Sequence, residues 1–423
     1  MNAGYVNNAS NGYAVIPFFI TAAIFFLVFS ILLFATGNEI LGHYFQPKVL
    51  AIVHTLALGW GTMIIMGAAY QLVPVIFETN LKYPALSFLS YILLTFGTSI
   101  LVYCFWFFKT NYLLIIAGSL ITLSSYLYFI IVWLTSKDTD KNFEFNLYWM
   151  LSAFWFCFTT TVGLLLAINL VESFMTKSHL DILKLHAHAG FIGWFLQLIL
   201  GAAAKMIPMF LLGKSDKKIL LFISIILINA GLLLFLVDAY RNQISFFSLV
   251  FGGIIFLGFI SWLFFIIVCI KNRLRKKVDI PMKHTIISFA CLIIAFLTSP
   301  LVIQYESGNW VTLYGTWIFL GWITGIILGM TFKTLPFIIW NLAYKNLNGN
   351  VKVPLPKDLY SSILIKIQYY LFLISLSITV TSIIFKIRWM IDISTGLWIL
   401  LSVCYLLNVF KVIAHKPNIH HGN

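Results

Sequence analysis

Charge is what the sequence has least of. Only 9% of the 423 residues are charged, whereas 61% are hydrophobic, and the mean hydropathy is +0.98. Soluble globular domains carry about 25% charged residues, so this composition excludes a soluble globular protein. Polar segments are scarce too: none exceeds about 15 residues, which leaves no room for a separate soluble domain.

Cysteine motifs and a basic leader are also missing. The five cysteines stand in apolar runs without C-x-x-C spacing, which predicts small hydrophobic side chains and neither a disulfide framework nor a zinc site: Cys104, Cys157, Cys269, Cys291 and Cys404. No basic segment precedes the first apolar run, near residues 14–36. We therefore expect that run to be a retained helix and not a cleaved signal.

What is present is a series of twelve apolar runs, each long enough to cross about 30 Å of hydrocarbon as a helix. They lie near 14–36, 49–76, 85–108, 111–135, 147–171, 185–212, 218–240, 246–270, 284–303, 310–341, 360–384 and 390–413. The prediction is an all-α polytopic membrane protein in which residues 1–423 form a single twelve-helix membrane domain.

The net charge of +14 is then explained by the orientation of the chain in the membrane. With the N-terminus in the cytoplasm, 17 of the 27 Lys and Arg residues fall in inside loops, 7 in outside loops and 3 within spans. The positive-inside rule therefore predicts that both termini are cytoplasmic. It also removes the reason to expect nucleic-acid binding.

A motif recurs in the second, sixth and tenth runs. Each contains G-W-x6-G-x6-P, at spacings of 134 and 128 residues: Gly59-Trp60 with Gly67 and Pro74, Gly193-Trp194 with Gly201 and Pro208, and Gly321-Trp322 with Gly329 and Pro336. This predicts three pseudo-symmetric four-helix repeats, about 14–135, 147–270 and 284–413. Glycine and proline in such helices are typical of close packing.

Polar rings stand at one depth before this motif. Five positions before the first Gly are His54, His188 and Thr316, and seven positions before it are Ile52, His186 and Tyr314. An intramembrane histidine is costly without a partner, so these are candidate site residues; hydrogen bonding between helices is the alternative. The remaining histidines, His43, His179, His284, His415, His420 and His421, are expected in loops or the tail, in contact with solvent.

Helix geometry constrains how these residues pair. Two residues of separation correspond to about 200° of rotation, so His186 and His188 are expected to face opposite ways. In a threefold arrangement His54 would then face His186, and His188 would face Tyr314. This pairing is a hypothesis.

A haem is the group that best uses histidines in an apolar, aromatic gap between helices, because its macrocycle prefers burial and its iron takes one or two imidazoles. A bare transition-metal ion is served less well, since no carboxylate or thiolate stands at the same depth. Haem propionates need cations near the outer surface, and Lys386 and Arg388 stand there; snorkelling to the interface is their alternative role.

The motif resembles one in a known family. His186-Ala187-His188-Ala189-Gly190, followed by Gly193-Trp194, Gly201 and Pro208, is similar to the H-x-H-x-G-x-x-G-W…G…P helix of haem-copper oxidase subunit I, and the cbb-type branch is the most similar. Twelve helices, a histidine in the second helix and basic residues before the last extend the resemblance over the whole chain. NnrS proteins, twelve-helix haem proteins tied to nitric oxide metabolism, are a looser relative.

The resemblance implies roles for individual residues. His186 and His188 would ligate haem iron, His54 would be an axial ligand, and Lys386 with Arg388 would contact propionates. One or two haems, b-type, are implied, with a cytochrome c or a quinone as electron donor and other respiratory subunits as partners. The implied chemistry is electron transfer or the handling of oxygen or nitric oxide.

Two departures from that family limit the implied activity. The family carries H-x-H on its tenth helix, where this chain has Tyr314-Gly315-Thr316, and its copper needs further histidines on the sixth and seventh helices, whereas the run 218–240 has none. A standard copper centre is therefore not expected. Carboxylates are confined to the ends of the runs (Glu78, Glu172, Asp238 and Glu306), so proton pumping is not expected either.

Two other classes of function fit the same sequence. A transporter of a metal ion or small molecule would use the threefold bundle and its histidines as a midplane site, and a non-catalytic partner of a respiratory complex would need neither metal nor haem. Lys205 and Lys333 share one repeat position, three before the proline. They can snorkel to the inner surface or line a path for protons or anions.

Overall fold

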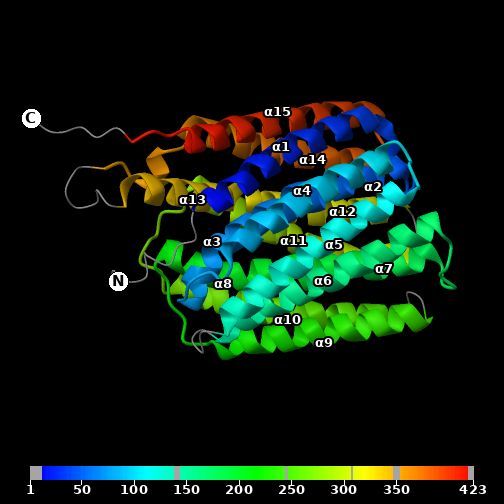
Figure 1. Cartoon of the computed structure of the whole chain (residues 1–423), viewed down its shortest axis with the longest axis horizontal. Coiled ribbons are helices and arrows are strands. Elements are labelled where there is room, and N and C mark those ends of the chain that lie inside the picture. Colours follow the sequence, from blue (N-terminus) through cyan, green and yellow to red (C-terminus); the bar gives the residue numbers. More distant parts are fainter. Residues whose placement is uncertain (1–11, 138–142, 243–245, 306–307, 346–352, 418–423) are drawn as a thin grey trace, which may run out of the picture. The chain divides into compact units, whose positions relative to one another are not determined.

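The fold, a computed structural model, consists of helices and short connections without any strand in the residues it describes, which are 12–137, 143–242, 246–305, 308–345 and 353–417 (Figure 1). The helices are α1 (Gly12–Thr36), α2 (Pro47–His54), α3 (Met63–Phe77), α4 (Pro84–Trp106), α5 (Tyr112–Ser136), α6 (Phe143–Val171), α7 (His179–His188), α8 (Gln197–Leu211), α9 (Ile219–Asn242), α10 (Phe246–Lys271), α11 (Ile280–Tyr305), α12 (Gly308–Thr316), α13 (Thr324–Tyr344), α14 (Ser362–Phe385) and α15 (Arg388–Ile413). Short 3-10 turns lie at η2 (Gly37–Leu41) and η6 (Pro356–Asp358).

Within these described ranges, twelve helical spans are long and apolar enough to cross a membrane, which confirms the predicted number. Predicted and observed ends agree within a few residues, with the largest difference in the sixth span, which begins at His179 instead of 185. In a bilayer every backbone polar group must be satisfied within the segment, and a helix does so. An apolar run that crosses the bilayer is therefore expected to be helical, as it is here.

The second, sixth and tenth spans differ from the other nine. They are the longest, with 31, 33 and 37 residues, and 61–72% of their most apolar stretch is buried against 28–50% elsewhere. Each consists of two α-helices joined by a π-helical segment: η3 (Thr55–Thr62), η4 (Ala189–Leu196) and η5 (Trp317–Ile323). These are the helices that carry the repeated motif.

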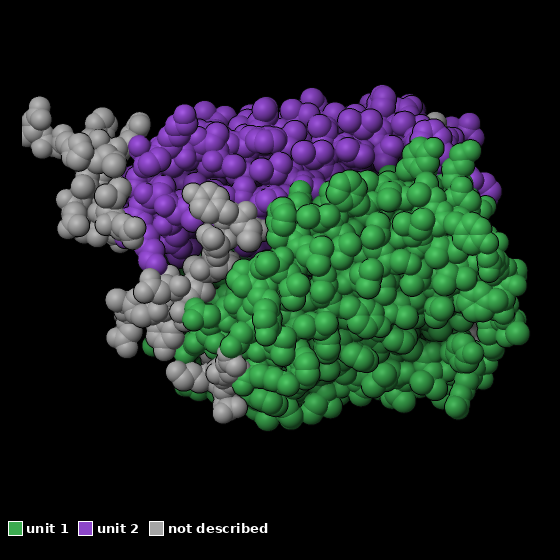
Figure 2. Space-filling view, in the orientation of Figure 1, with its two compact units in different colours: residues 1–10, 70–104, 109–278 green, residues 11–69, 105–108, 279–423 purple. Residues whose placement is uncertain are grey.

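The chain divides into two compact units, coloured separately in Figure 2. Unit 1 comprises residues 1–10, 70–104 and 109–278, and unit 2 comprises residues 11–69, 105–108 and 279–423. His186 and His188 lie in unit 1, whereas His54, Tyr314, Lys386 and Arg388 lie in unit 2. The arrangement as one domain of three four-helix repeats stays a prediction.

The two glycines of each motif contact the helix that precedes it in the same repeat. A methyl group on Gly59, Gly193 or Gly321 would lie 2.4–2.8 Å from Phe25, Trp155 or Cys291, and one on Gly67, Gly201 or Gly329 would lie 2.5–2.9 Å from the Cβ of Phe18, Tyr148 or His284. The two contacted residues are seven apart in every case. Glycine is therefore required at both motif positions for the close approach of each of these helices to the span before it.

The motif tryptophans lie in matching aromatic clusters. In unit 2, Trp60 stacks on Phe26 at 4.3 Å and meets Tyr405 edge-on at 4.8 Å. In unit 1, Trp194 stacks on Phe156 at 4.4 Å and meets Tyr128 edge-on at 5.4 Å. The two tyrosines also meet the ring eleven residues after the motif Gly, Tyr405 with Phe332 and Tyr128 with Tyr70, both at 5.7 Å. Two repeats thus surround their tryptophan in the same way.

Candidate functional site

The candidate histidines stand where the backbone changes from α to π. His54 is the last residue of α2 and His188 the last of α7, and the π-helical segments begin at the next residue. Thr316 occupies the same place before η5. Short π-helical segments are rare in proteins, but those that occur are often found at functional sites. The repeated spacing in the sequence predicts the shared depth of these residues but not the π-helical geometry.

His54 and His188 have the same surroundings. The Nδ1 of His54 lies 2.8 Å from the Leu50 carbonyl, and the Nδ1 of His188 lies 2.8 Å from the Lys184 carbonyl, in each case four residues back. Each ring packs on a phenylalanine of the following span: His54 on Phe105 at 5.1 Å and 46°, and His188 on Phe235 at 4.7 Å and 45°.

His186 turns to a different neighbour. Its Nδ1 lies 2.9 Å from the carbonyl of Thr159 on α6, and Gly163 of α6 leaves room for the ring, because a Cβ there would lie 2.8 Å from the imidazole Cε1. His188 instead packs on Phe235 of α9. The expectation that these two histidines face different ways from one helix is therefore confirmed.

The hydrogen bonds determine which ring nitrogen carries the proton. A carbonyl oxygen only accepts, so Nδ1 is the donor in all three histidines. In the neutral ring Nε2 then carries the lone pair. Imidazoles whose other nitrogen donates to a carbonyl are the usual metal ligands, since the bond fixes both tautomer and orientation. The donor set therefore fits axial ligation of haem iron.

The third repeat has no imidazole at this depth. Thr316 is buried and its hydroxyl donates to the Thr312 carbonyl at 2.8 Å, four residues back, as the histidines do. Tyr314 is half-buried two residues earlier on α12. The predicted contacts of His54 with His186 and of His188 with Tyr314 join residues of different units. They stay predictions.

Lys386 and Arg388 lie between α14 and α15. Lys386 ends α14 in a left-handed conformation with φ 55°, Arg388 begins α15, and both side chains are exposed. Within unit 2, η2 and α15 are in contact, and Gly37 of η2 lies next to Asp392 near the start of α15. The two cations therefore lie at the end of unit 2 where α2, the helix of His54, begins.

Two of the remaining histidines, His179 and His284, lie in helices although both were expected in loops, and His179 is the first residue of α7. His284 is the fifth residue of α11, which begins at Ile280 and not at 284, and it is fully buried. His43 is exposed, as expected. His179 and His415 are half-buried, and His415 lies 2.8 Å from the Tyr344 hydroxyl. His420 and His421 fall outside the described residues.

No group of three or more His, Cys, Asp or Glu side chains that could hold a metal ion occurs among the residues the structure describes. The candidate ligands of a haem are instead single imidazoles on separate helices. Comparison with protein-family models and with curated protein sequences finds no match.

Proposed function

We propose that this chain is a haem-binding membrane protein in which His54, His186 and His188 ligate iron. The observation that carries the proposal is the matched geometry of His54 and His188, each held by a carbonyl four residues back and by a phenylalanine of the following span. Two helices thus present the same nitrogen, Nε2, with its lone pair. A purely structural histidine has no need for this repetition.

The other candidate residues would position the macrocycle. Lys386 and Arg388, exposed at the α14–α15 turn, would hold the propionates, and half-buried Tyr314 would lie beside the site of His188. A bound haem would supply a one-electron redox couple and an iron that takes a diatomic gas. The protein's own contribution is ligand orientation and an apolar, aromatic surrounding.

The proposed class is a reduced member of the haem-copper oxidase superfamily, with one or two b-type haems and no standard copper centre. It would act in electron transfer or in handling oxygen or nitric oxide. The setting would be a bacterial cytoplasmic membrane with both termini inside, a cytochrome c or quinone as donor, and other respiratory subunits as partners.

Oxidised and reduced absorption spectra of the purified protein, with haem extracted and quantified per chain, test this proposal. A Soret band that shifts on reduction is expected in the wild type. Under the pairing of His54 with His186, alanine at either position should abolish the same spectral component, and His188→Ala should remove a separate one. His43→Ala is the matched control, because His43 is exposed and lies in the loop before α2. Colourless, well-folded protein from cells supplied with haem precursor would refute haem binding.

One observation favours a transporter as the second candidate. Three spans contain π-helical segments, and irregular helices at membrane depth are common where transporters bind substrate. A haem-free protein that binds a divalent metal ion, and loses that binding in His54→Ala and His188→Ala, would support this candidate. Protein without haem or metal that co-purifies with respiratory subunits would indicate a non-catalytic partner.

A further inference from the structure

His284 occupies a position that is aromatic in the other two repeats. The second glycine of the motif contacts Phe18 of α1 in the first repeat, Tyr148 of α6 in the second and His284 of α11 in the third. Phe18 and Tyr148 are fully buried, and so is His284. The third repeat has no histidine beside its π-helical segment. It has His284 instead, on α11, packed against the second motif glycine on α13.

The polar partner of His284 is also buried. Gln368 of α14 is fully buried, its Nε2 donates to the Leu328 carbonyl at 3.2 Å, and it lies 3.4 Å from Nε2 of His284. Tyr369 and Phe372 pack on the imidazole at 5.1 and 5.3 Å. Among the described residues, Nδ1 of His284 and Oε1 of Gln368 have no hydrogen-bond partner.

To be satisfied, these two atoms need a hydrogen-bond acceptor and a hydrogen-bond donor. Because the Gln368 amide nitrogen donates to Nε2 of His284, the ring proton is on Nδ1, which needs an acceptor, while Oε1 of Gln368 needs a donor. Buried polar groups in proteins are nearly always satisfied, by protein or by ordered water. Water supplies both functions at once.

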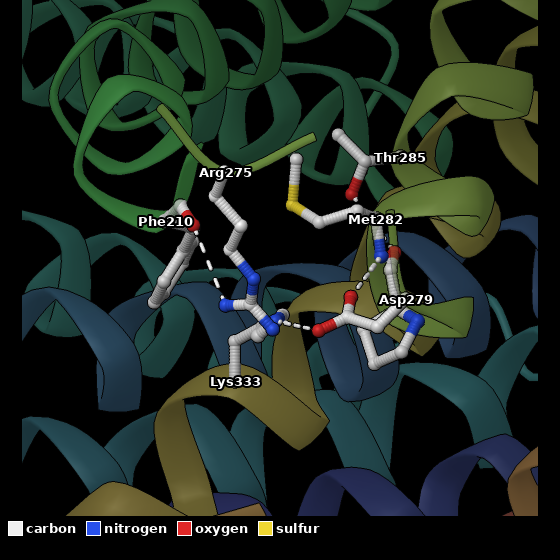
Figure 3. Close-up of polar contacts among 7 residues, drawn as sticks. Phe210, Arg275, Asp279, Met282, Thr285 and Lys333 are labelled. Atoms are coloured by element: carbon white, nitrogen blue, oxygen red, sulfur yellow. Dashed lines mark hydrogen bonds and ion pairs between the residues drawn. The ribbon is translucent and has the colours of Figure 1, made fainter. Parts of the chain in front are cut away.

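A partly exposed ion pair, the candidate entry for water, lies about one helical turn away. Asp279 caps α11, since its carboxylate accepts from the backbone N–H of Met282 at 3.2 Å, and it forms an ion pair with Lys333 of α13 (Figure 3). The side chains of Asp279 and Lys333 are 32% and 12% exposed. Lys333 is four residues, about 6 Å along the helix, from Gly329, whose Cα lies against His284.

That entry lies at the end of unit 2 where the described chain begins and ends. Gly12 at the start of α1 lies against Leu342 near the end of α13, and Tyr344 bonds His415 just after α15. Lys333 is in the same half of the tenth span, Gly308–Tyr344. On the predicted orientation this is the cytoplasmic end.

We propose that His284 and Gln368 form the inner end of a hydrated inlet, which admits water from the Asp279–Lys333 end of unit 2. The inlet brings solvent to an imidazole, a group that exchanges protons at either nitrogen. Asp279, Lys333 and Tyr369 are ionisable groups near it among the described residues of unit 2, whereas Lys366 of α14 and Lys283 of α11 are exposed. This inference is independent of haem binding.

Deuterium exchange at the imidazole Cε1–H, measured peptide by peptide by mass spectrometry, tests the inlet in the unmodified protein. A hydrated His284 should exchange within about tenfold of exposed His43. An exchange rate more than about a hundredfold slower than that of His43 would mean a dry site and would overturn the proposal.

Cysteine accessibility gives a second test with controls from the chain itself. In a background with all five native cysteines replaced by alanine, His284→Cys and Gln368→Cys are compared with Phe18→Cys and Tyr148→Cys. A small charged thiol reagent, applied to membrane vesicles from the side of the termini, should modify the first pair about tenfold faster or more. The controls delete large side chains too, so a newly made cavity cannot explain that difference. Equal rates at all four positions, or reaction from the opposite side alone, would overturn the inlet.

Discussion

The second and tenth spans differ at one informative position. Both contain a π-helical segment over the motif Gly-Trp, but His54 precedes it in the second span and Thr316 in the tenth. Since the backbone adopts the same form with either residue, imidazole is not what produces the π segment. The histidines of the second and sixth spans are therefore additions to a shared packing scheme, which is the physical reason to assign them a ligand.

The largest effect is expected when His54 or His188 is replaced by threonine, the residue at the equivalent position of the third repeat. His54→Thr and His188→Thr should keep the helical fold, because a threonine hydroxyl can bond the carbonyl four residues back as Thr316 does. Each should lower the haem content of its site by about tenfold or more, since an axial ligand is lost. Circular dichroism and extracted haem per chain are the measurements.

Thr316→Ala is the matched control for these variants. It changes the equivalent position in a repeat that offers no ligand there, so haem content should stay at the wild-type value. Equal haem loss in Thr316→Ala, or full haem content in His54→Thr, would contradict the assignment of the histidines as ligands.

The next effect concerns the glycines that define the repeats. Gly193→Ala should lower the free energy of unfolding by about 1–3 kcal/mol, because the new methyl would lie 2.4 Å from the buried Trp155 ring. Gly315→Ala is its counterpart on a helix with open space around the added carbon, and it should be neutral or slightly stabilising. Thermal unfolding in detergent checks both, and similar losses in the two variants would refute the close-packing role.

Much of this architecture could be predicted from sequence, since the bilayer demands long apolar helices and close packing demands glycine at repeated positions. The π-helical segments could not be predicted, because no characteristic amino-acid pattern distinguishes i→i+5 hydrogen bonding from an α-helix. His284 was misplaced because neighbouring Lys283 suggested a loop. Asp279 followed by Ile280-Pro281, an N-cap with proline in the first turn, was the signal that could have placed it in a helix.

A smaller effect is expected at the turn between α14 and α15. Lys386→Gln with Arg388→Gln should weaken haem retention by about fivefold to tenfold, roughly 1 kcal/mol, because exposed charges contribute modestly. Haem loss to an excess of apomyoglobin measures it. Lys48→Gln is the control, a half-buried lysine in the first turn of α2 that pairs with Glu39 at 2.7 Å, and it should leave retention unchanged. Equal effects of the two changes would point to general charge and not to propionate contacts.

The smallest effect separates the two aromatic clusters. Tyr405 and Tyr128 hold the same place beside Trp60 and Trp194, but the Tyr405 hydroxyl donates to Thr331 at 3.0 Å, whereas the Tyr128 hydroxyl has no hydrogen-bond partner among the described residues. Tyr405→Phe should therefore cost about 0.5–1 kcal/mol of unfolding free energy. Tyr128→Phe should be neutral or stabilising, because it removes an unsatisfied buried hydroxyl. If Tyr128→Phe is the more costly change, its hydroxyl has a partner such as bound water, and the two clusters then differ in hydration as well as in sequence.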